Sequence, residues 1–505
     1  MPAFEEIEDP AIRVRERGGR LLVAGGAARD LAIRHIHGRS RPFPEGGDLD
    51  LVVFGLDLEG ILAAAGSPVS GGPPARIVWR LAGDRDSRRT ALVTFRRGGV
   101  RMEAMAPRSD GPVTGSGSSS ASAFGGLESV PFSDGALAGD AGFRDFTVNA
   151  LYFDPLERRF LDPLGSGLDD VRSGFVRPVS PGSIPADPVR MLRAMALVSR
   201  RPFAASSQLL DQVRASAGML DRSCPERFWP EWRRAAEGSW PHLGLRFLEE
   251  SGLIARFPEL DVLRGLQQYH TFHPEGSVWN HTVLVVQAMS RLPLPPSSDR
   301  AALVMTALLH DVGKAQAARA AQAAPSSGMI LYPDHAALGA PVARAFMRRV
   351  EAPDRTARAV SKLTARHMDS AFRTLTPGRL RWIARELAPE ADLRDFWAIC
   401  AADWNGRSPW PEEYPWSLEE FLEPVRGEAG PPADLVNGSE LMASFGIPEG
   451  PEVGRLLKLV RHEHDEGRVD TREGALDFLA GLLRHEASGI RGFEPAAGAA
   501  DGIPA

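Results

Sequence analysis

The sequence is poor in cysteine and contains no long hydrophobic run. Only Cys224 and Cys400 occur among 505 residues, so a disulfide framework is not expected. The N-terminal stretch MPAFEEIEDP is acidic and has no apolar core, which argues against a secretory signal. No stretch of about 18 apolar residues, the length of a membrane span, is present. We therefore expect a cytoplasmic protein without a membrane segment.

The chain also lacks an overall excess of basic charge. Its formal net charge is −6, which excludes a protein coated with positive charge. Arginine is nevertheless concentrated locally, because residues 187–234 hold nine Arg against five Asp or Glu, a surplus of four positive charges. A polyanion is expected to lie along this stretch.

The length and patterning predict several domains. A chain of 505 residues exceeds what one hydrophobic core supports and suggests about three or four domains. Residues 20–56 are typical of strand, glycine turn, helix and strand, and the pattern is helical from about residue 185. Residues 107–141 have almost no periodicity, which predicts a mobile loop or an insertion. The expected fold class is α+β, with a small mixed sheet followed by helical domains.

Two acidic residues in GGDLDLVV (46–53) form the first candidate site. Asp48 and Asp50 alternate on a predicted strand, so both carboxylates face one side and can share divalent cations. Two metals about 4 Å apart would stabilise the attacking and leaving oxygens of a phosphoryl transfer. Glu103, in GVRMEAMAP, is the candidate third acid on a neighbouring strand. A D-x-D pair alone is more often a solvated strand end, so the assignment depends on its neighbours.

A glycine pair in AGGAARDL (24–31) supplies such a neighbour. Gly25 and Gly26 would let backbone amides approach a triphosphate at the start of a helix. Arg29 and Asp30 follow on that helix as further nucleotide-binding candidates. A lone Gly-Gly is a turn, but the combination with D-x-D at this spacing is far more specific than either part.

The third motif, GFRDFTVNALYFDP (142–155), is dense in polar side chains. In this order the three motifs resemble G-G-x-x-R-D, D-x-D and R-R-D-F-T-x-N-A-L of the class II tRNA nucleotidyltransferases and bacterial poly(A) polymerases. The resemblance implies that Arg144, Asp145, Thr147 and Asn149 bind the triphosphate and sugar of a nucleotide beside the metal site. The resemblance also covers residues 160–179, 186–197 and 435–460.

The same resemblance implies a base-reading pair. Asp187 and Arg190 match the family motif E-D-x-x-R, which reads C or A without a template. They are three residues apart and are therefore predicted on one helical face. Arg193 is a further nucleotide-binding candidate. Ala186 and Phe143 stand where the family has Glu and Arg. Complete CCA addition, partial (CC-only or A-only) addition and poly(A) synthesis therefore all remain open.

A second constellation lies in the helical region. VWNHTVLVV supplies His281, LLHDVGKAQ supplies His310 and Asp311, and CAADWNGRS supplies Asp403. Imidazoles and carboxylates suit a divalent or transition metal, and an adjacent His-Asp pair on one helix would place two ligands near the same ion. The order resembles the HD phosphohydrolase domain.

Further polar residues surround these four. The resemblance implies that His335 and His367 extend the site to a second metal or to phosphate, with Lys314 of the HDVGK motif steadying the phosphate. For His270 and His273 a role as buried hydrogen-bonding residues is favoured over metal ligation.

These observations define the expected organisation and activity. The reaction would be attack of an RNA 3′-hydroxyl, most simply of tRNA, on CTP or ATP, with Mg²⁺ in the head and Ni²⁺, Mn²⁺ or Co²⁺ in the HD domain. Two rival interpretations are an HD phosphohydrolase with a decayed head and an RNA-binding module with two inactive sites. The expected domains are a nucleotidyltransferase head (1–160), a helical neck and body (161–265), an HD domain (266–425), a C-terminal helical segment (426–485) and a disordered tail (486–505).

Overall fold

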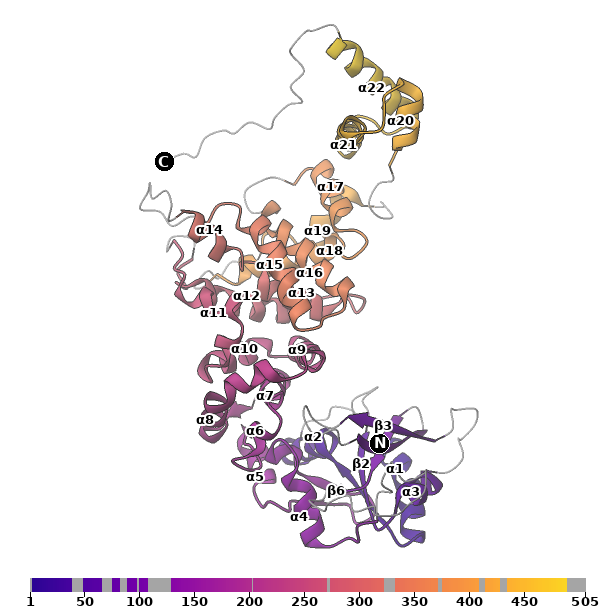
Figure 1. Ribbon diagram of the computed structural model, residues 1–505, viewed down its shortest axis with the longest axis vertical. Coiled ribbons are helices and arrows are strands. Elements are labelled where there is room, and N and C mark those ends of the chain that lie inside the picture. The colour runs from indigo at the N-terminus through magenta and orange to yellow at the C-terminus, as the bar shows by residue number, and fades with distance from the viewer. Residues whose placement is uncertain are drawn as a thin grey trace.

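The computed structural model shows an elongated chain with its strand-rich N-terminal part at one end and helices extending away from it (Figure 1). The residues that the structure describes are 2–38, 49–65, 75–81, 89–97, 100–107, 129–201, 203–269, 273–321, 332–370, 375–407, 414–426 and 434–487.

One mixed sheet organises the N-terminal part, or head. Its strands are β1 (Arg20–Ala24), β2 (Leu49–Phe54), β3 (Arg76–Leu81), β4 (Arg89–Arg97), β5 (Val100–Met105), β6 (Tyr152–Asp154) and β7 (Arg159–Leu161). Their order in the sheet is β3-β4-β5-β2-β1-β6-β7. The central pair β2–β5 is parallel, and the other neighbouring strands are antiparallel. The expected mixed sheet in an α+β protein is confirmed.

Helices cover the two faces of this sheet unequally. The head helices are α1 (Pro2–Glu16), α2 (Gly25–His37), α3 (Leu58–Ala65), α4 (Asp134–Gly142) and α5 (Gly167–Ser173). Leu51 and Val53 belong to the large core that α1, α2 and α3 share. Val52 and Phe54 point to the opposite face, where they form a small core with α4. Because side chains alternate along a strand, Asp50 lies on the α4 face.

Helix α4 corrects part of the expected loop. The interpretation of residues 107–141 as a loop is wrong from residue 134, where α4 begins, whereas residues 108–128 lie outside the described residues. Ser133 caps α4, because its Oγ accepts a hydrogen bond from Ala136 N at 3.1 Å. The helix buries Leu137, Asp140 and Ala141, of which only two are apolar, so its hydrophobic periodicity is weak.

A helical neck follows the head. It comprises α6 (Ser183–Ala186), α7 (Arg190–Arg200), α8 (Ser207–Ser216), α9 (Phe228–Ala236), α10 (Pro241–Glu250) and α11 (Pro258–Asp261), with a short parallel pair of strands, β8 (Phe175–Val176) and β9 (Ala204–Ala205). Helix α7 packs closely on α10 because Gly244 has no side chain: a Cβ there would lie 2.1 Å from Ser199 Oγ. Small residues thus set the spacing within the neck.

Two further helical groups complete the chain. The first contains α12 (Val278–Arg291), α13 (Arg300–Leu309), α14 (Lys314–Ala321), α15 (His335–Arg349), α16 (Asp354–Arg366), α17 (Pro377–Leu387), α18 (Leu393–Asn405) and α19 (Leu418–Leu422). The second, at the far end in Figure 1, contains α20 (Gly438–Phe445), α21 (Pro451–Asp465) and α22 (Arg472–Ala487), with a core of its own. None of the described helices is long and apolar enough to cross a bilayer.

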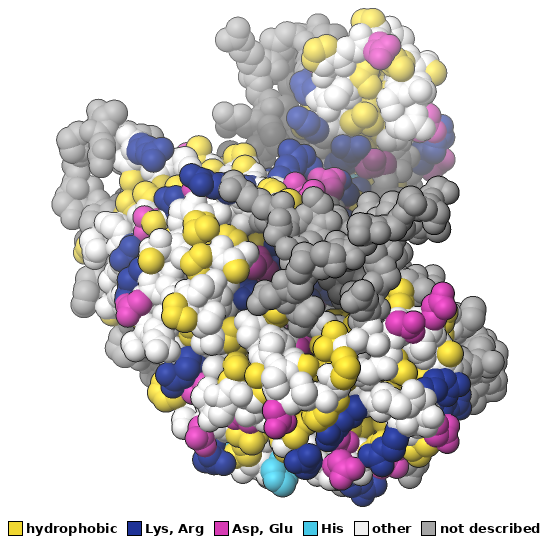
Figure 2. All heavy atoms as spheres, turned by 60° about the horizontal axis from the view of Figure 1, so that its bottom comes forward, with side chains coloured by type: hydrophobic (Ala, Val, Ile, Leu, Met, Phe, Trp, Pro, Cys, Tyr) yellow, Lys and Arg dark blue, Asp and Glu magenta, His cyan; other side chains and the backbone are white. Residues whose placement is uncertain are grey.

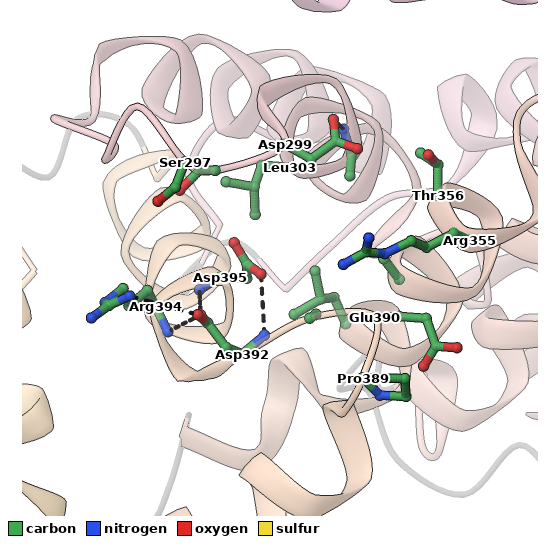
Figure 3. Close-up of a pocket in the computed structure, with 15 residues that line it drawn as sticks. Ser297, Asp299, Leu303, Arg355, Thr356, Pro389, Glu390, Asp392, Arg394 and Asp395 are labelled. Carbon is green, nitrogen blue, oxygen red and sulfur yellow. Dashed lines mark hydrogen bonds and ion pairs between the residues drawn. The ribbon is translucent and has the colours of Figure 1, made fainter. Parts of the chain in front are cut away.

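A cavity of about 400 Å³ lies where α13, α16 and α18 begin (Figure 3). Asp299 caps α13 by accepting a hydrogen bond from Ala302 N, and Asp392 forms a capping box with Asp395 at the start of α18. Arg355, in the first turn of α16, lines the same cavity. The three helices therefore all begin at the cavity and end away from it.

Candidate functional site

The carboxylates of the head meet across the parallel strand pair. Asp50 on β2 and Glu103 on β5 are register partners, so their side chains project from the same face of the sheet. Glu103 is buried, and Arg101 Nη2 lies 3.0 Å from its Oε1. Asp48 lies outside the described residues, so its place beside Asp50 stays a prediction. Two adjacent carboxylates are a donor set that suits a hard divalent cation.

The glycine turn lies next to these acids. Gly25 begins α2 with a φ of +64°, and a Cβ on it would lie 3.3 Å from both Asp50 Oδ2 and Arg144 Nη1. The N-cap residue of α2 is Ala24, whose side chain cannot accept hydrogen bonds from the first amides of the helix. A free helix N-terminus beside a guanidinium favours an anion. Gly26 lies close to the side chain of Arg29.

Arg144 is held on two sides by buried partners. Asp140 Oδ2 accepts hydrogen bonds from Arg144 Nε at 3.1 Å and Nη2 at 2.9 Å. Tyr152 Oη also accepts from Arg144 Nε and donates to Asp140 Oδ2. Burial lowers the pKa of Arg144, but the charge of Asp140 outweighs it and the pKa is raised. The guanidinium is thus fixed with Nη1 toward Gly25.

Asp145 links the third motif to the neck. Its Oδ1 accepts from Asn149 Nδ2 at 2.9 Å, and its Oδ2 accepts from Arg193 Nη1 at 3.0 Å. Burial raises the pKa of Asp145, but Arg193 and Asn149 outweigh it and hold the pKa at about 2. Asn149 Oδ1 in turn accepts from Arg29 Nη1 at 2.6 Å. Residues of three separate motifs therefore form one hydrogen-bonded network.

The remaining motif residues of the head brace the protein internally. Asp30 accepts from Arg29 and from Arg201 Nη2, the latter at 2.7 Å, which ties α2 to the neck. Thr147 Oγ1 donates to Asp170 Oδ2 at 2.6 Å, which fixes the turn that contains Asn149.

The base-reading pair is arranged differently from the sequence expectation. Asp187 and Arg190 do not share one helical face: Asp187 is extended at the end of α6, and Arg190 begins α7. Pro188 explains the break, because proline disfavours the helical conformation of the residue before it. Arg190 donates to the backbone carbonyls of Phe143, Arg144 and Ser183, and its Nε lies 4.0 Å from Asp187 Oδ2.

Two residues that the sequence analysis did not single out support this region. Arg227 Nη2 donates to Asp187 Oδ2 at 2.7 Å, and buried Glu231 Oε1 accepts from Arg193 Nε at 3.3 Å. Both lie in PERFWPEW at the start of α9. The signal that could have revealed them is a pair of opposite charges spaced four residues apart in a helix with aromatic residues between them.

The arginine surplus of residues 187–234 is largely used within the protein. Arg193, Arg201, Arg214, Arg227, Arg233 and Arg234 all form ion pairs with acidic residues. On the face shown in Figure 2, Lys and Arg side chains are interspersed with Asp and Glu. The local composition therefore overstates the charge that this stretch offers to a polyanion.

The second constellation converges in the helical region. Its members are His281, His310, Asp311, His335, His367 and Asp403, which we call the histidine–aspartate cluster. His281 Nε2 lies 2.9 Å from Asp403 Oδ1. Asp311 joins the two halves, because its Oδ2 lies 3.2 Å from His310 Nε2 and its Oδ1 lies 3.2 Å from His335 Nε2. All six residues are buried.

The position of the cluster follows from the ends of three helices. His310 and Asp311 come directly after α13, in a turn and not on one helix as expected; His367 follows α16, and Asp403 lies in the last turn of α18. These are the helices that begin at the cavity of Figure 3. Their carboxyl ends carry partial negative charge, which favours a cation at the cluster.

The imidazoles are oriented as metal ligands are. The Nδ1 atoms of His310, His335 and His367 lie 2.7–2.9 Å from backbone carbonyls, which leaves each Nε2 toward the cluster. His335 Nε2 and His367 Nε2 are only 3.2 Å apart. His310 Nε2 is buried without a hydrogen-bond partner among the described residues. The donor set therefore fits a bound transition metal.

The electrostatics of the cluster are unbalanced without a cation. Burial lowers the pKa of His281, but Asp403 and Glu275 outweigh it and raise the pKa to about 9. Burial together with His310 and His335 lowers the pKa of His367 to about 3. His281 and His367, which lie on either side of His310, thus have pKa values shifted in opposite directions, as expected when buried charges of both signs lie close together.

The other predicted residues of this region take outer positions. Lys314 Nζ donates to Asp311 Oδ2 at 2.6 Å and to Gln268 Oε1 at 2.5 Å, so it contacts the cluster through an acid. His273 is half-buried and makes a hydrogen bond with Glu275, and with Glu275 and His281 it also forms a group of possible metal ligands, so its expected role stays a prediction. His270 lies outside the described residues.

Comparison with known proteins identifies the two regions separately. Residues 21–177 match the poly A polymerase head domain, and residues 278–404 match the HD domain. Both domain types imply the use of divalent metal ions. The first match contains Gly25, Asp50, Glu103 and Arg144, and the second contains the whole histidine–aspartate cluster.

Relatives cover most of the chain. It is 32% identical over 354 residues to the CC-adding tRNA nucleotidyltransferase of Thermus thermophilus, covering 68% of this chain and 77% of the relative. It is 30% identical over 363 residues to the A-adding tRNA nucleotidyltransferase of Deinococcus radiodurans, covering 68% and 79%.

A solved structure has the same fold. The CCA-adding enzyme of Bacillus stearothermophilus in complex with CTP superposes with a TM-score of 0.59 at 19% identity, covering 97% of this chain and 100% of that one. The head motifs, the HD domain and the extent of these matches show that the chain belongs to the class II tRNA nucleotidyltransferases.

Proposed function

We propose that the head transfers cytidylate or adenylate residues, or both, from CTP and ATP to the 3′-hydroxyl of tRNA. The observation that carries this proposal is the register pairing of Asp50 with Glu103 beside the uncapped N-terminus of α2 and the fixed guanidinium of Arg144. Carboxylates for a cation and donors for a triphosphate then lie within one small region.

The proposed reaction is a single displacement. The 3′-oxygen of the RNA forms a bond to the α-phosphorus, the bond to pyrophosphate breaks, and the hydroxyl proton passes to solvent. Mg²⁺ on Asp48, Asp50 and Glu103 would supply charge neutralisation and a lower pKa of the attacking hydroxyl. Arg144 and the α2 amides would hold the triphosphate, while Asp145 and Asn149 would orient the sugar.

Base recognition is assigned to the neck. Asp187 Oδ1 is buried without a hydrogen bond among the described residues, so it is the acceptor available for an exocyclic amine of C or A. Arg190 would contribute by holding the backbone of the third motif against α7, and Arg193 by holding Asp145.

A stepwise extension assay tests this function. The protein is incubated with tRNAs that end before CCA, after one C or after both, each with one labelled nucleotide at a time. Extension by C only, by A only, by both in sequence, or by repeated A distinguishes CC-adding, A-adding, CCA-adding and poly(A) activities. No extension of any of the three tRNAs would refute the proposal.

The HD domain is proposed to be a metal-dependent phosphohydrolase. The Nε2 atoms that converge on Asp311 and Asp403 favour Ni²⁺, Mn²⁺ or Co²⁺ over Mg²⁺. A bound ion would activate water for attack on a phosphoester. Hydrolysis of a 2′,3′-cyclic nucleotide that requires one of these ions is the expected result, and failure of the protein to bind any of them would refute the proposal.

A further inference from the structure

The chain just before α12, described over residues 266–269 and 273–277 and called here the α12 approach segment, lies beside the histidine–aspartate cluster. Its two ends are joined by backbone hydrogen bonds, from Val278 N to Leu266 O at 2.9 Å and from Gln268 N to Gly276 O at 3.0 Å. These bonds hold the segment, and with it Glu275, next to His281 in the first turn of α12.

Glu275 in this segment contacts His281 on the side away from the cluster. Its Oε1 lies 2.8 Å from His281 Nδ1, and its side chain is only 3% exposed. A negative carboxylate at this distance favours the tautomer of His281 that carries its proton on Nδ1, with Nε2 toward Asp403. The other three imidazoles of the cluster are oriented by neutral backbone carbonyls.

Two further residues of the segment, His273 and Gln268, also contact side chains that adjoin the cluster. His273 Nδ1 lies 2.9 Å from Glu275 Oε1, which holds the carboxylate from the far side. Gln268, also buried, accepts from Lys314 Nζ at 2.5 Å and thereby keeps the ammonium on Asp311. The segment therefore restrains both His281 and Lys314 from outside.

We propose that Glu275 is a positioning residue of the HD metal centre, which fixes the tautomer and orientation of His281, and that Gln268 positions Lys314 in the same way. This inference rests on the proposed metal centre. A charged acceptor behind a metal-bound imidazole makes that imidazole a stronger donor, and loss of such a partner typically lowers metal affinity about 10–100-fold.

The test is a Co²⁺ titration of the full chain followed by its visible absorbance. Glu275→Gln is expected to weaken Co²⁺ binding about 10–100-fold. Glu390→Gln is the matched control, because Glu390 is a half-buried acid of the HD domain that pairs with Lys362 and Arg358 and not with the cluster. That variant is expected to bind Co²⁺ as tightly as the unsubstituted protein.

A spectroscopic readout separates positioning from a purely structural role. In the Co²⁺-loaded protein the Nδ1 proton of His281 should give a shifted NMR signal that exchanges slowly with water, and Glu275→Gln should speed its exchange. This signal is expected in the unsubstituted chain, so the inference is testable even if the variant does not fold.

The outcomes distinguish the two proposals. If the unsubstituted protein binds no Co²⁺, Ni²⁺ or Mn²⁺, the metal centre itself is refuted and the inference falls with it. If Co²⁺ binds but Glu275→Gln leaves both the affinity and the proton exchange unchanged, only the positioning role is overturned. A fall in melting temperature of the metal-free variant with unchanged affinity would also overturn it.

Discussion

The head and the HD domain differ in how their buried charged groups are paired. In the head, Arg144, Asp145 and Arg193 all have opposite charges as partners, so the network is balanced on its own. In the HD domain, imidazoles face one another around Asp311 and Asp403, with His335 and His367 3.2 Å apart. The ion pairs of the head are complete without a ligand, whereas the facing imidazoles and carboxylates of the HD domain suit a bound cation.

The substitution Asp50→Ala should give the largest separation between the two regions. It removes a carboxylate from the strand pair that carries Glu103, so nucleotide addition should fall by about 10²–10³-fold or more. Co²⁺ binding by the HD domain should not change. Asp169→Ala, which alters an exposed acid of the head, is the control. More than a few per cent of residual nucleotide addition would contradict the assignment of Asp50 as a metal ligand. Asp48→Ala should behave in the same way.

The reciprocal change is the double substitution His310→Ala with Asp311→Ala. Because Asp311 joins both halves of the cluster, Co²⁺ binding and phosphodiester hydrolysis should both be lost. Addition of nucleotides to tRNA should stay within about twofold, since both residues belong to the HD domain and not to the head. A folded double variant that still hydrolyses at the original rate would make the cluster a structural feature only.

Arg193→Ala probes how much the balanced network matters for catalysis. Loss of Arg193 leaves Asp145 and Glu231 without their shared partner, which should cost about 1–3 kcal/mol. The KM for the nucleotide should rise more than kcat falls, because Asp145 orients Asn149. Arg214→Ala, at an exposed pair, serves as the control. Equal KM values in the two variants would argue against a link between neck and nucleotide.

The smallest effect is expected at the cavity of Figure 3. Burial and the charges of Asp392 and Asp299 raise the pKa of Asp395 to about 6. The folded form therefore holds a proton that the unfolded chain has released, so this stabilisation is present below about pH 4 and is lost as the pH rises through 6. Asp395→Asn should raise the melting temperature by about 1–3 °C at pH 8 and not at pH 4. An equal change at both pH values would contradict the raised pKa.

Residues whose roles depend on local pattern were predictable. Gly25 begins a helix, Asp50 lies on a strand, and Glu103 was expected on a neighbouring strand, where the structure pairs it with Asp50. Alternation and turn chemistry are properties of a few consecutive residues, so the sequence carries them. Pro188 also predicts the break between Asp187 and Arg190, although their three-residue spacing is typical of one helical face.

Other features depend on partners that are distant in the chain. Arg227 and Glu231 matter because they contact Asp187 and Arg193, and Glu275 matters because it contacts His281. Charged residues like these are common on solvated helices, so even the charge spacing of Arg227 and Glu231 does not identify their partners. Helix α4 was missed because only two of its buried side chains, Leu137 and Ala141, are apolar.

The sequence by itself determined the α+β class, the order of head and HD motifs, and the residue types of both sites, because these follow from periodicity and from which side chains can bind phosphate or metal. Only the tertiary structure decided which charges neutralise one another. The arginines of residues 187–234 mainly form ion pairs within the protein. Helices α13, α16 and α18 begin at one cavity and end at the histidine–aspartate cluster. The distance between two side chains depends on how whole elements pack, and composition does not contain that information.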